Sequence, residues 1–198
     1  MSLLKKLEYL FNFKIKSSEE KEIVEHPVNL SLDDFFVHNF INNGGKFLYC
    51  TSQEDALNNL HQIIKENHWY SITCFESSLT NFTSAIPINL INEINENSPF
   101  LTKCEHLISE NGSILFSSNQ LKEHKLADFS NHFIVYAKTS QIVNTTSDGL
   151  CGINNRNRGN IPTNIGAIKN FTPMQNDNFL NYGYTNSKNL YLLLVEDL

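Results

Sequence analysis

The hydrophobic pattern divides the chain into a short amino-terminal arm and one larger domain. In residues 2–12 the apolar side chains recur on one face of a helix, at Leu3, Leu4, Leu7, Leu10 and Phe11. The polar stretch that follows ends at Pro27 and is typical of a linker. We therefore assign residues 1–28 to a helix and linker arm, and residues 29–198 to a single domain. The apolar face of the arm either covers its own domain or docks on a partner chain or a second copy.

From residue 31 onward the pattern predicts alternating helices and strands. Ser31 stands at the N-cap of a helix that carries several phenylalanines and ends at Asn43-Gly44-Gly45. Residues 46–50 form a short apolar run typical of a buried strand, a helix runs from Ser52 to about Asn67, and residues 70–75 form a second strand. A strand, a helix and a strand at this spacing indicate a parallel sheet with helices packed on its faces.

The second half of the chain continues the alternation less regularly. Pro87 is expected to begin a helix that carries Ile88, Leu90, Ile91 and Ile94. Residues 104–117 contain two apolar runs joined by an Asn-Gly turn, which predicts a β-hairpin. Residues 132–137 and 189–197 predict two further buried strands, whereas residues 144–189 lack apolar periodicity. The sequence therefore predicts an α/β fold with a mostly parallel open sheet and one hairpin.

Composition narrows the class of protein. Charged residues are only 18% of the chain, 28 residues are asparagine, and the net charge is −6 with a pI near 5.6. This balance argues against a nucleic-acid-binding protein, which normally shows a clustered basic face. No apolar run is long enough to span a membrane. The amino terminus has no cleavage site of the signal-peptide kind, so we expect a cytoplasmic protein.

The four cysteines and seven histidines do not predict a metal site. No cysteine pair has C-x-x-C spacing and no histidine pair has H-x-x-x-H spacing. Three cysteines, Cys50, Cys74 and Cys104, lie in apolar stretches and are expected to be small buried side chains. The P-loop and the G-x-S-x-G elbow are also absent from the sequence. We therefore expect no bound metal and no cofactor.

The hairpin turn is the best candidate for chemistry. Glu110 would place a carboxylate at a strand end, next to Gly112, whose lack of a side chain lets a ligand approach the backbone. The alternative is an ordinary turn with its glutamate facing water, since turn chemistry alone explains every residue from 110 to 113.

Four segments of the second half resemble one known family in their order and spacing. They are ISENGSILF (108–116), HFIVYAKTSQIV (132–143), NIPTNIGAIK (160–169) and NYGYTNSKNLYLLLV (181–195). They are similar to the A-E-T-G-T strand, the h-I-V-V-V strand, the G-P-S-x-T-x-D-I-E segment and the G-V-H-G-P turn of the LUD-domain family, whose type is lactate-utilisation protein C. The chain resembles a divergent member, because Ala167 and Lys169 replace the family's Asp and Glu, and residues 185–187 replace its His-Gly-Pro turn.

The resemblance implies a three-layer α/β/α fold similar to the NagB/RpiA/CoA-transferase group, with ligands at the carboxyl ends of strands. It implies an accessory, non-redox role in oxidising L-lactate to pyruvate, with iron–sulfur and oxidoreductase functions on partner chains. The alternative is a small-molecule enzyme or ligand-binding module for a small anion. In that alternative Glu110 is base or nucleophile, and the remaining candidate ligand-binding residues are Gly112, Ser113, Pro162, Thr163, Asn164 and Gly183. The sequence does not decide whether the chain is an enzyme or a homo-oligomer.

Overall fold

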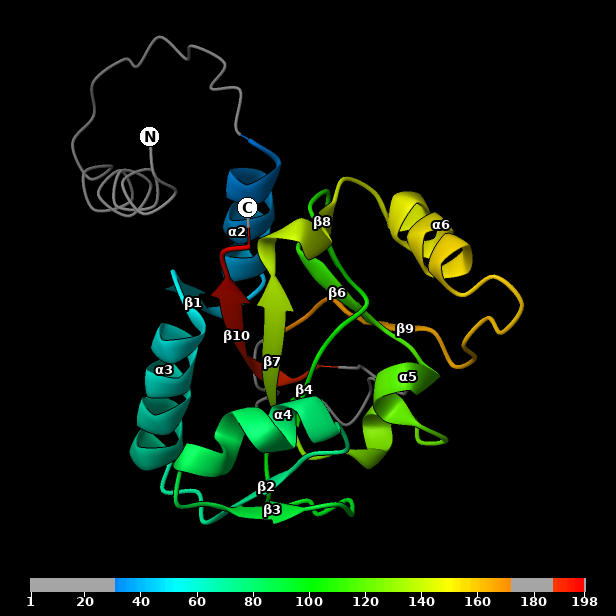
Figure 1. Ribbon diagram of the computed structural model, residues 1–198. Helices are drawn as coiled ribbons and strands as arrows, with labels where there is room; N and C mark the ends of the chain where they lie inside the picture. The colour runs from blue at the N-terminus through cyan, green and yellow to red at the C-terminus, as the bar shows by residue number, and fades with distance from the viewer. Residues whose placement is uncertain (1–30, 172–186, 198) are drawn as a thin grey trace, which may run out of the picture.

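The computed structural model describes residues 31–171 and 187–197 (Figure 1). Its helices are α2 (Leu32–Asn42), α3 (Gln53–Glu66), α4 (Ser77–Phe82), α5 (Ser118–Leu121) and α6 (Thr146–Arg156), with 3-10 turns η1 (Thr83–Ala85), η2 (Leu126–Asp128) and η3 (Thr139–Gln141). Its strands are β1 (Lys46–Cys50), β2 (Ser71–Thr73), β3 (Asn89–Ile91), β4 (Phe100–Thr102), β5 (His106–Ile108), β6 (Ser113–Phe116), β7 (His132–Lys138), β8 (Ile142–Val143), β9 (Gly166–Ile168) and β10 (Asn189–Val195). The expected amino-terminal arm, residues 1–28, and Gly183 lie outside the described residues.

A six-stranded sheet forms the centre of the fold. Its strand order is β1-β10-β7-β4-β2-β3, and every neighbouring pair is parallel. Because side chains alternate across a strand, the sheet contributes to two cores. Helices α3 and α4 complete the core on one face, and α2 together with a second, smaller sheet completes the core on the other. The predicted α/β fold, mostly parallel and built in three layers, is confirmed.

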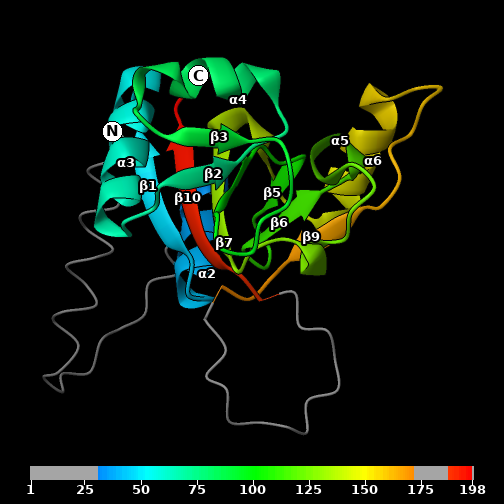
Figure 2. The ribbon, with the colours of Figure 1, turned by 90° about the horizontal axis from the view of Figure 1, so that it is seen from below.

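The second sheet carries the predicted hairpin. Its strand order is β8-β5-β6-β9, and β5 pairs with β6 in antiparallel register, with Ile108 opposite Ser113. The inner face of this sheet joins the core beneath α2, whereas its outer face packs against α6 through Ile108, Leu115 and Ile153. Figure 2 shows α6 on the side of the small sheet that faces away from β7. The hairpin prediction for residues 104–117 is therefore confirmed.

Two local predictions differ from the structure. Residues that follow Pro87 form the short edge strand β3, which pairs in parallel with β2, and not a helix. The apolar run there is too short for its periodicity to separate a strand from a helix, and pairing with β2 decides the outcome. Residues 146–156, in the stretch without apolar periodicity, form α6. A capping box of Thr145 and Asp148 begins this helix. The sequence feature that indicates α6 is therefore this local capping pattern and not apolar periodicity.

The expected burial of three cysteines is confirmed. Cys50, Cys74 and Cys104 are buried, and Cys151 on α6 is exposed. Burial raises the pKa of each buried thiol, so these groups are protonated and behave as small apolar side chains. Within the described ranges, none of the helices has the length and hydrophobicity that a bilayer crossing requires.

Lys188 is a buried cation at the amino end of β10. Only 4% of the residue is exposed, and its Nζ donates hydrogen bonds to the carbonyl oxygens of Phe129 at 2.9 Å and Ser130 at 3.1 Å. The same Nζ lies 5.3 Å from the ring centroid of Phe133. Burial lowers the pKa of Lys188 to about 8, although the charge of Asp128 acts in the opposite direction. The ammonium group therefore fixes the two loops that lead into β7 and β10, at a cost in desolvation.

The cost of burying the Lys188 ammonium group makes the stability of the protein depend on pH. Between pH 8 and about 10.5 the unfolded chain holds the Lys188 proton more tightly than the folded chain, so the contribution of this group to stability rises with pH. We expect the free energy of unfolding of the wild type, relative to Lys188→Met, to increase by roughly 3 kcal/mol across this window. Urea titrations of both proteins at several pH values measure the difference, in which the titration of shared groups cancels. A flat or falling difference would contradict the prediction.

Candidate functional site

The structure places Glu110 at the amino end of α6. Its Oε1 atom accepts hydrogen bonds from the backbone N–H and the hydroxyl of Thr146, both at 2.9 Å. The carboxylate is exposed and stabilises the first turn of α6, where the helix dipole favours a negative charge. In the described structure Glu110 therefore caps a helix that the sequence pattern did not predict.

The backbone of the hairpin turn is engaged within the protein. The Gly112 N–H donates to the carbonyl oxygen of Ile108 at 2.9 Å, and the Ser113 N–H donates to Asn111 Oδ1 at 3.0 Å. Ser113 is fully buried. Gly112 has a φ of +66° and faces the backbone of α2, not open space. These two N–H groups thus already have partners, and the space beside Gly112 is occupied by a helix.

The other candidate segment lies at the opposite end of β6. Two hydrogen bonds join Thr163 to Ser118. The Thr163 N–H donates to Ser118 Oγ at 3.0 Å, and the Thr163 carbonyl oxygen accepts from the Ser118 N–H at 2.9 Å. Asn164 adopts a φ of +53° and donates from its side chain to the carbonyl oxygen of His124. Pro162 beside them is buried. The structure therefore does not bring residues 162–164 together with the turn at residues 110–113.

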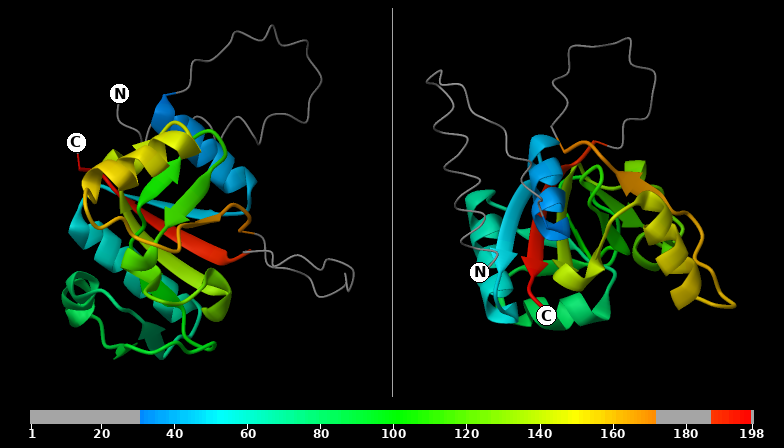
Figure 3. Two further views of the ribbon diagram at one scale, coloured as in Figure 1. Left: turned by 90° about the vertical axis from the view of Figure 1, so that its right-hand side faces the viewer. Right: turned by 90° about the horizontal axis from the view of Figure 1, so that it is seen from above.

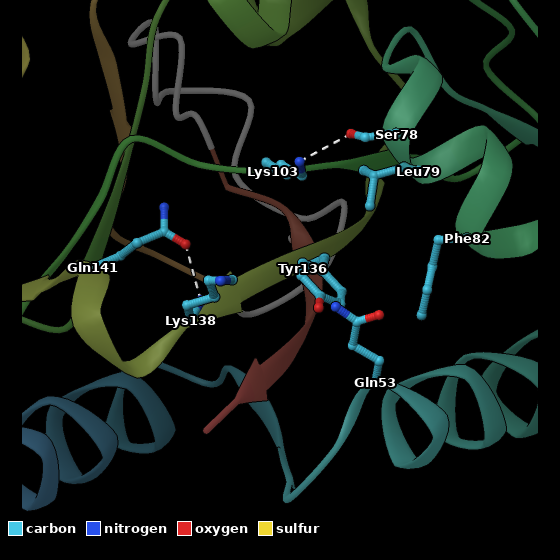
Figure 4. Close-up of a pocket in the computed structure, with 8 residues that line it drawn as sticks. All are labelled: Gln53, Ser78, Leu79, Phe82, Lys103, Tyr136, Lys138 and Gln141. Atoms are coloured by element: carbon cyan, nitrogen blue, oxygen red, sulfur yellow. Dashed lines mark hydrogen bonds between the residues drawn. The ribbon is translucent and has the colours of Figure 1, made fainter. Parts of the chain in front are cut away.

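A cavity of about 230 Å³ lies where the strands of the large sheet end, beneath α4 (Figure 4). Its walls come from the end of β7, from the segments that follow β1, β4 and β7, and from α4: Gln53, Ser78, Leu79, Phe82, Lys103, Tyr136, Lys138 and Gln141. The carboxyl ends of parallel strands are the usual place for a ligand in an open α/β sheet. The right-hand view of Figure 3 shows two of these parallel strands, β1 (cyan) and β10 (red), side by side.

Two lysines supply the positive charge of the cavity. Lys103 follows β4; its Nζ donates to Ser78 Oγ at 2.9 Å and lies 3.7 Å from a Glu76 carboxylate oxygen. Lys138 ends β7, and its Nζ lies 3.5 Å from Asp197. Both lysine side chains are close to half exposed, so each is positioned by a carboxylate while its ammonium group remains accessible to a ligand.

The remaining polar groups of the cavity differ in whether they already form hydrogen bonds within the protein. The Gln141 side chain is held in place, since its Oε1 accepts from the Lys138 N–H and its Nε2 donates to the carbonyl oxygen of Cys104. In the described part of the chain, the Gln53 amide and the Tyr136 hydroxyl form no hydrogen bond. Burial raises the pKa of Tyr136, with further contributions from Cys50 and Asp197, so its hydroxyl keeps its proton and can donate to a ligand.

A buried carboxylate lies behind the cavity. Glu105 is 2% exposed, and its Oε1 accepts from Ser117 Oγ at 2.6 Å, Asn119 Nδ2 at 2.9 Å and Gln120 Nε2 at 3.2 Å. Arg156 Nη1, from the last turn of α6, lies 3.3 Å from Glu105 Oε2. Burial alone raises the pKa of Glu105, but these hydrogen bonds and Arg156 outweigh it and lower the pKa below its usual value. The ionised carboxylate thus ties α5 and α6 to the segment between β4 and β5.

His106 extends this cluster toward α6. Burial lowers the pKa of His106, so the imidazole is neutral. Its Nδ1 lies 3.3 Å from the Gln141 carbonyl oxygen and its Nε2 lies 3.2 Å from Arg156 Nη2, so Nδ1 carries the proton and Nε2 accepts from the guanidinium. Across residues 31–171 and 187–197 no three His, Cys, Asp or Glu side chains are grouped in a way that could hold a metal ion.

Sequence reasoning did not single out the cavity lysines. Lys138 directly follows the predicted strand at residues 132–137, but Lys103 directly precedes the predicted hairpin at residues 104–117, and the two lysines are 35 positions apart in the chain. Polar residues directly after parallel strands meet at one edge of a sheet, so this signal was available for Lys138 and not for Lys103, whose strand β4 was not predicted. The strand order that places β4 beside β7 could not be read from either segment alone.

Comparison with known proteins gives a likeness in fold. No protein-family model matches the chain, and no curated protein matches it. A solved structure of a DUF162 family protein from Deinococcus radiodurans is similar to it, with a TM-score of 0.59 and 13% sequence identity. The match covers 85% of this chain and 99% of that chain. At this identity the comparison establishes a shared fold across most of both chains.

Proposed function

We propose that this chain is an accessory protein of the LUD type whose α/β domain binds a small anionic ligand in the cavity beneath α4. DUF162 is the LUD-domain family, so the fold neighbour and the resemblance of the four sequence segments agree. The observation that carries the ligand site is the presence of Lys103 and Lys138 in one cavity at the carboxyl ends of the central strands. An ammonium group donates charge-assisted hydrogen bonds to carboxylate or phosphate oxygens.

The accessory role concerns the lactate-oxidation system that the resemblance implies. In that role the iron–sulfur and oxidoreductase steps belong to partner chains, and this chain contributes ligand binding. A pull-down with the full chain from its native cell is expected to recover such a partner. Recovery of neither an iron–sulfur protein nor an oxidoreductase would count against the accessory role and leave the ligand site to be judged separately.

The ligand site is tested by removing one lysine charge at a time. Calorimetric titration of the wild type with propanoate, L-lactate and inorganic phosphate is expected to show binding of at least one of them. Lys103→Met and Lys138→Met are each expected to weaken that binding by about tenfold or more, because a hydrogen bond to a charged group is lost. Lys65→Met is the matched control, since Lys65 is exposed on α3 and does not line the cavity. An equal loss in Lys65→Met, or no loss in either cavity variant, would refute the site.

The same titrations separate this proposal from a site at the hairpin turn. Glu110→Gln is expected to leave the affinity for these anions unchanged, because Glu110 caps α6 and does not line the cavity. In the alternative, an enzyme or binding module that uses Glu110 and the Gly112–Ser113 backbone, this variant weakens binding and the two lysine variants do not.

A further inference from the structure

We propose that the cavity prefers monocarboxylic acids that carry an aromatic or branched apolar group over lactate-sized acids and inorganic phosphate. This inference rests on the proposed anion site and adds the class of its ligand. It follows from the apolar wall of the cavity, from its volume and from the balance of its charges.

One side of the cavity is apolar. Leu79 and Phe82 project from α4, and the ring of Phe82 meets the ring of Tyr136 edge to face, with centroids 5.3 Å apart and an interplanar angle of 63°. Figure 4 shows Leu79 and Phe82 on the side opposite Lys138 and Gln141. A ligand that reaches from the lysines to this wall must therefore present an anionic end and an apolar end. Aromatic side chains favour such a partner because offset and edge contacts between rings add to the burial of apolar area.

The volume of the cavity exceeds what a lactate-sized acid fills. An apolar cavity of about 150 Å³ in another protein holds benzene. A cavity of about 230 Å³ thus has room for a six-membered ring together with a carboxylate group. A three-carbon acid bound at the lysines would leave the space beside Phe82 to water, and the burial of the apolar wall would contribute nothing to its affinity.

The charges favour a single negative charge on the ligand. Lys103 is paired with Glu76, and Lys138 is paired with Asp197. These four groups sum to zero, so the cavity offers hydrogen-bond donors for an anion without a strong net positive potential. Tyr136 adds a hydroxyl donor, and Gln53 adds an amide that can donate or accept. A monocarboxylate uses such donors fully, whereas a phosphate dianion gains less because the nearby carboxylates repel its second charge.

The test compares ligands that differ in one group at a time. Calorimetry with the full chain measures the affinities of 3-phenylpropanoate, propanoate, inorganic phosphate and the uncharged 3-phenylpropan-1-ol. We expect 3-phenylpropanoate to bind at least about tenfold more tightly than each of the other three. Phe82→Ala is expected to reduce this preference to about threefold or less, and Phe82→Leu is expected to retain part of the preference. Phe82 is half-buried, and thermal unfolding confirms that each variant is folded.

The outcomes separate the ligand class from the site itself. If propanoate or phosphate binds as tightly as 3-phenylpropanoate, and binding still depends on Lys103 and Lys138, the ligand class is wrong and the anion site stands. If the alcohol binds as tightly as the acid, or if no anion binds in a manner that depends on the two lysines, both proposals fail. A preference for the aromatic acid that persists unchanged in Phe82→Ala also overturns the assigned apolar wall.

Discussion

Replacing Glu105 with alanine is expected to lower the free energy of unfolding by about 3 kcal/mol or more. The carboxylate is buried, and its loss leaves the side chains of Ser117 and Gln120, also buried, without the acceptor that they share. A buried donor without a partner costs roughly 1–3 kcal/mol, and the alanine also leaves a void. Arg156 is more than half exposed, so water replaces part of its interaction and little of the loss comes from the ion pair. Urea denaturation of the variant and the wild type measures the effect.

Glu110→Ala is the matched control for Glu105→Ala. The Glu110 carboxylate, like that of Glu105, accepts hydrogen bonds within the protein, in this case two from Thr146. It differs in being exposed, and it stabilises the first turn of α6. Thr145 remains as the N-cap residue of α6, and loss of an exposed carboxylate beside a helix N-terminus typically costs about 0.3–1 kcal/mol. If the two alanine variants lost equal stability, the buried cluster around Glu105 would not hold the fold as the hydrogen bonds indicate.

The pH dependence of the Glu105 contribution has a definite sign. The folded protein binds this proton less tightly than the unfolded chain, since the surrounding donors lower the pKa of the carboxyl group. The stabilisation is therefore complete above the ordinary pKa of a glutamate and is lost as the pH falls through the lower value of the folded state. The wild type is accordingly expected to lose its advantage over Glu105→Gln in acid, and an advantage that grew as the pH fell would contradict the assignment.

The parts of the fold that could be read from sequence are those specified by local signals. The helices α2 and α3 begin at the serine caps Ser31 and Ser52, whose side chains accept from backbone N–H groups three residues later. The strands β7 and β10 are continuous apolar runs because both faces of the central sheet are covered. The Asn-Gly turn similarly specified the β5–β6 hairpin. Each of these elements needs few distant contacts to be recognised.

The parts that could not be read depend on contacts between distant segments. Strand β3 is defined by its pairing with β2, and β4 and β5, although adjacent in the chain, belong to different sheets. Helix α6 has a narrow apolar face, because two glycines, Gly149 and Gly152, bring its backbone close to the small sheet. Close packing of this kind leaves no apolar periodicity to detect.

The candidate site has the same limitation. The hairpin turn attracted attention because its residue types suit a ligand, whereas in the structure its glycine faces α2 and its glutamate caps α6. The cavity draws Lys103 and Lys138 from separate strand ends and Phe82 from α4, and only the strand order brings them together. The residue types in the sequence thus pointed to the hairpin turn, whereas the cavity is located by the strand order of the large sheet.

Replacing Gly112 with alanine is expected to lower the free energy of unfolding by about 3 kcal/mol, and measurably more than Gly159→Ala. Both glycines have a positive φ, +66° at Gly112 and +96° at Gly159, so an alanine strains the backbone at either position. A Cβ atom at Gly112 would lie 2.4 Å from the Phe40 backbone nitrogen, whereas one at Gly159 would meet nothing within 4 Å. The extra loss in Gly112→Ala therefore measures the contact between the hairpin and α2.

The Gly112→Ala variant also distinguishes a packing role from a ligand role for this glycine. If Gly112 allows α2 to pack on the hairpin, hydrogen exchange in α2 should accelerate in the variant, because the backbone around Asn39 and Phe40 must move away from the new methyl group. If Gly112 instead allowed a ligand to approach, stability would fall only as much as in Gly159→Ala and anion affinity would fall as well. Equal losses of stability at the two glycines, with unchanged exchange in α2, would show that the hairpin and α2 are not in the close contact that this geometry requires.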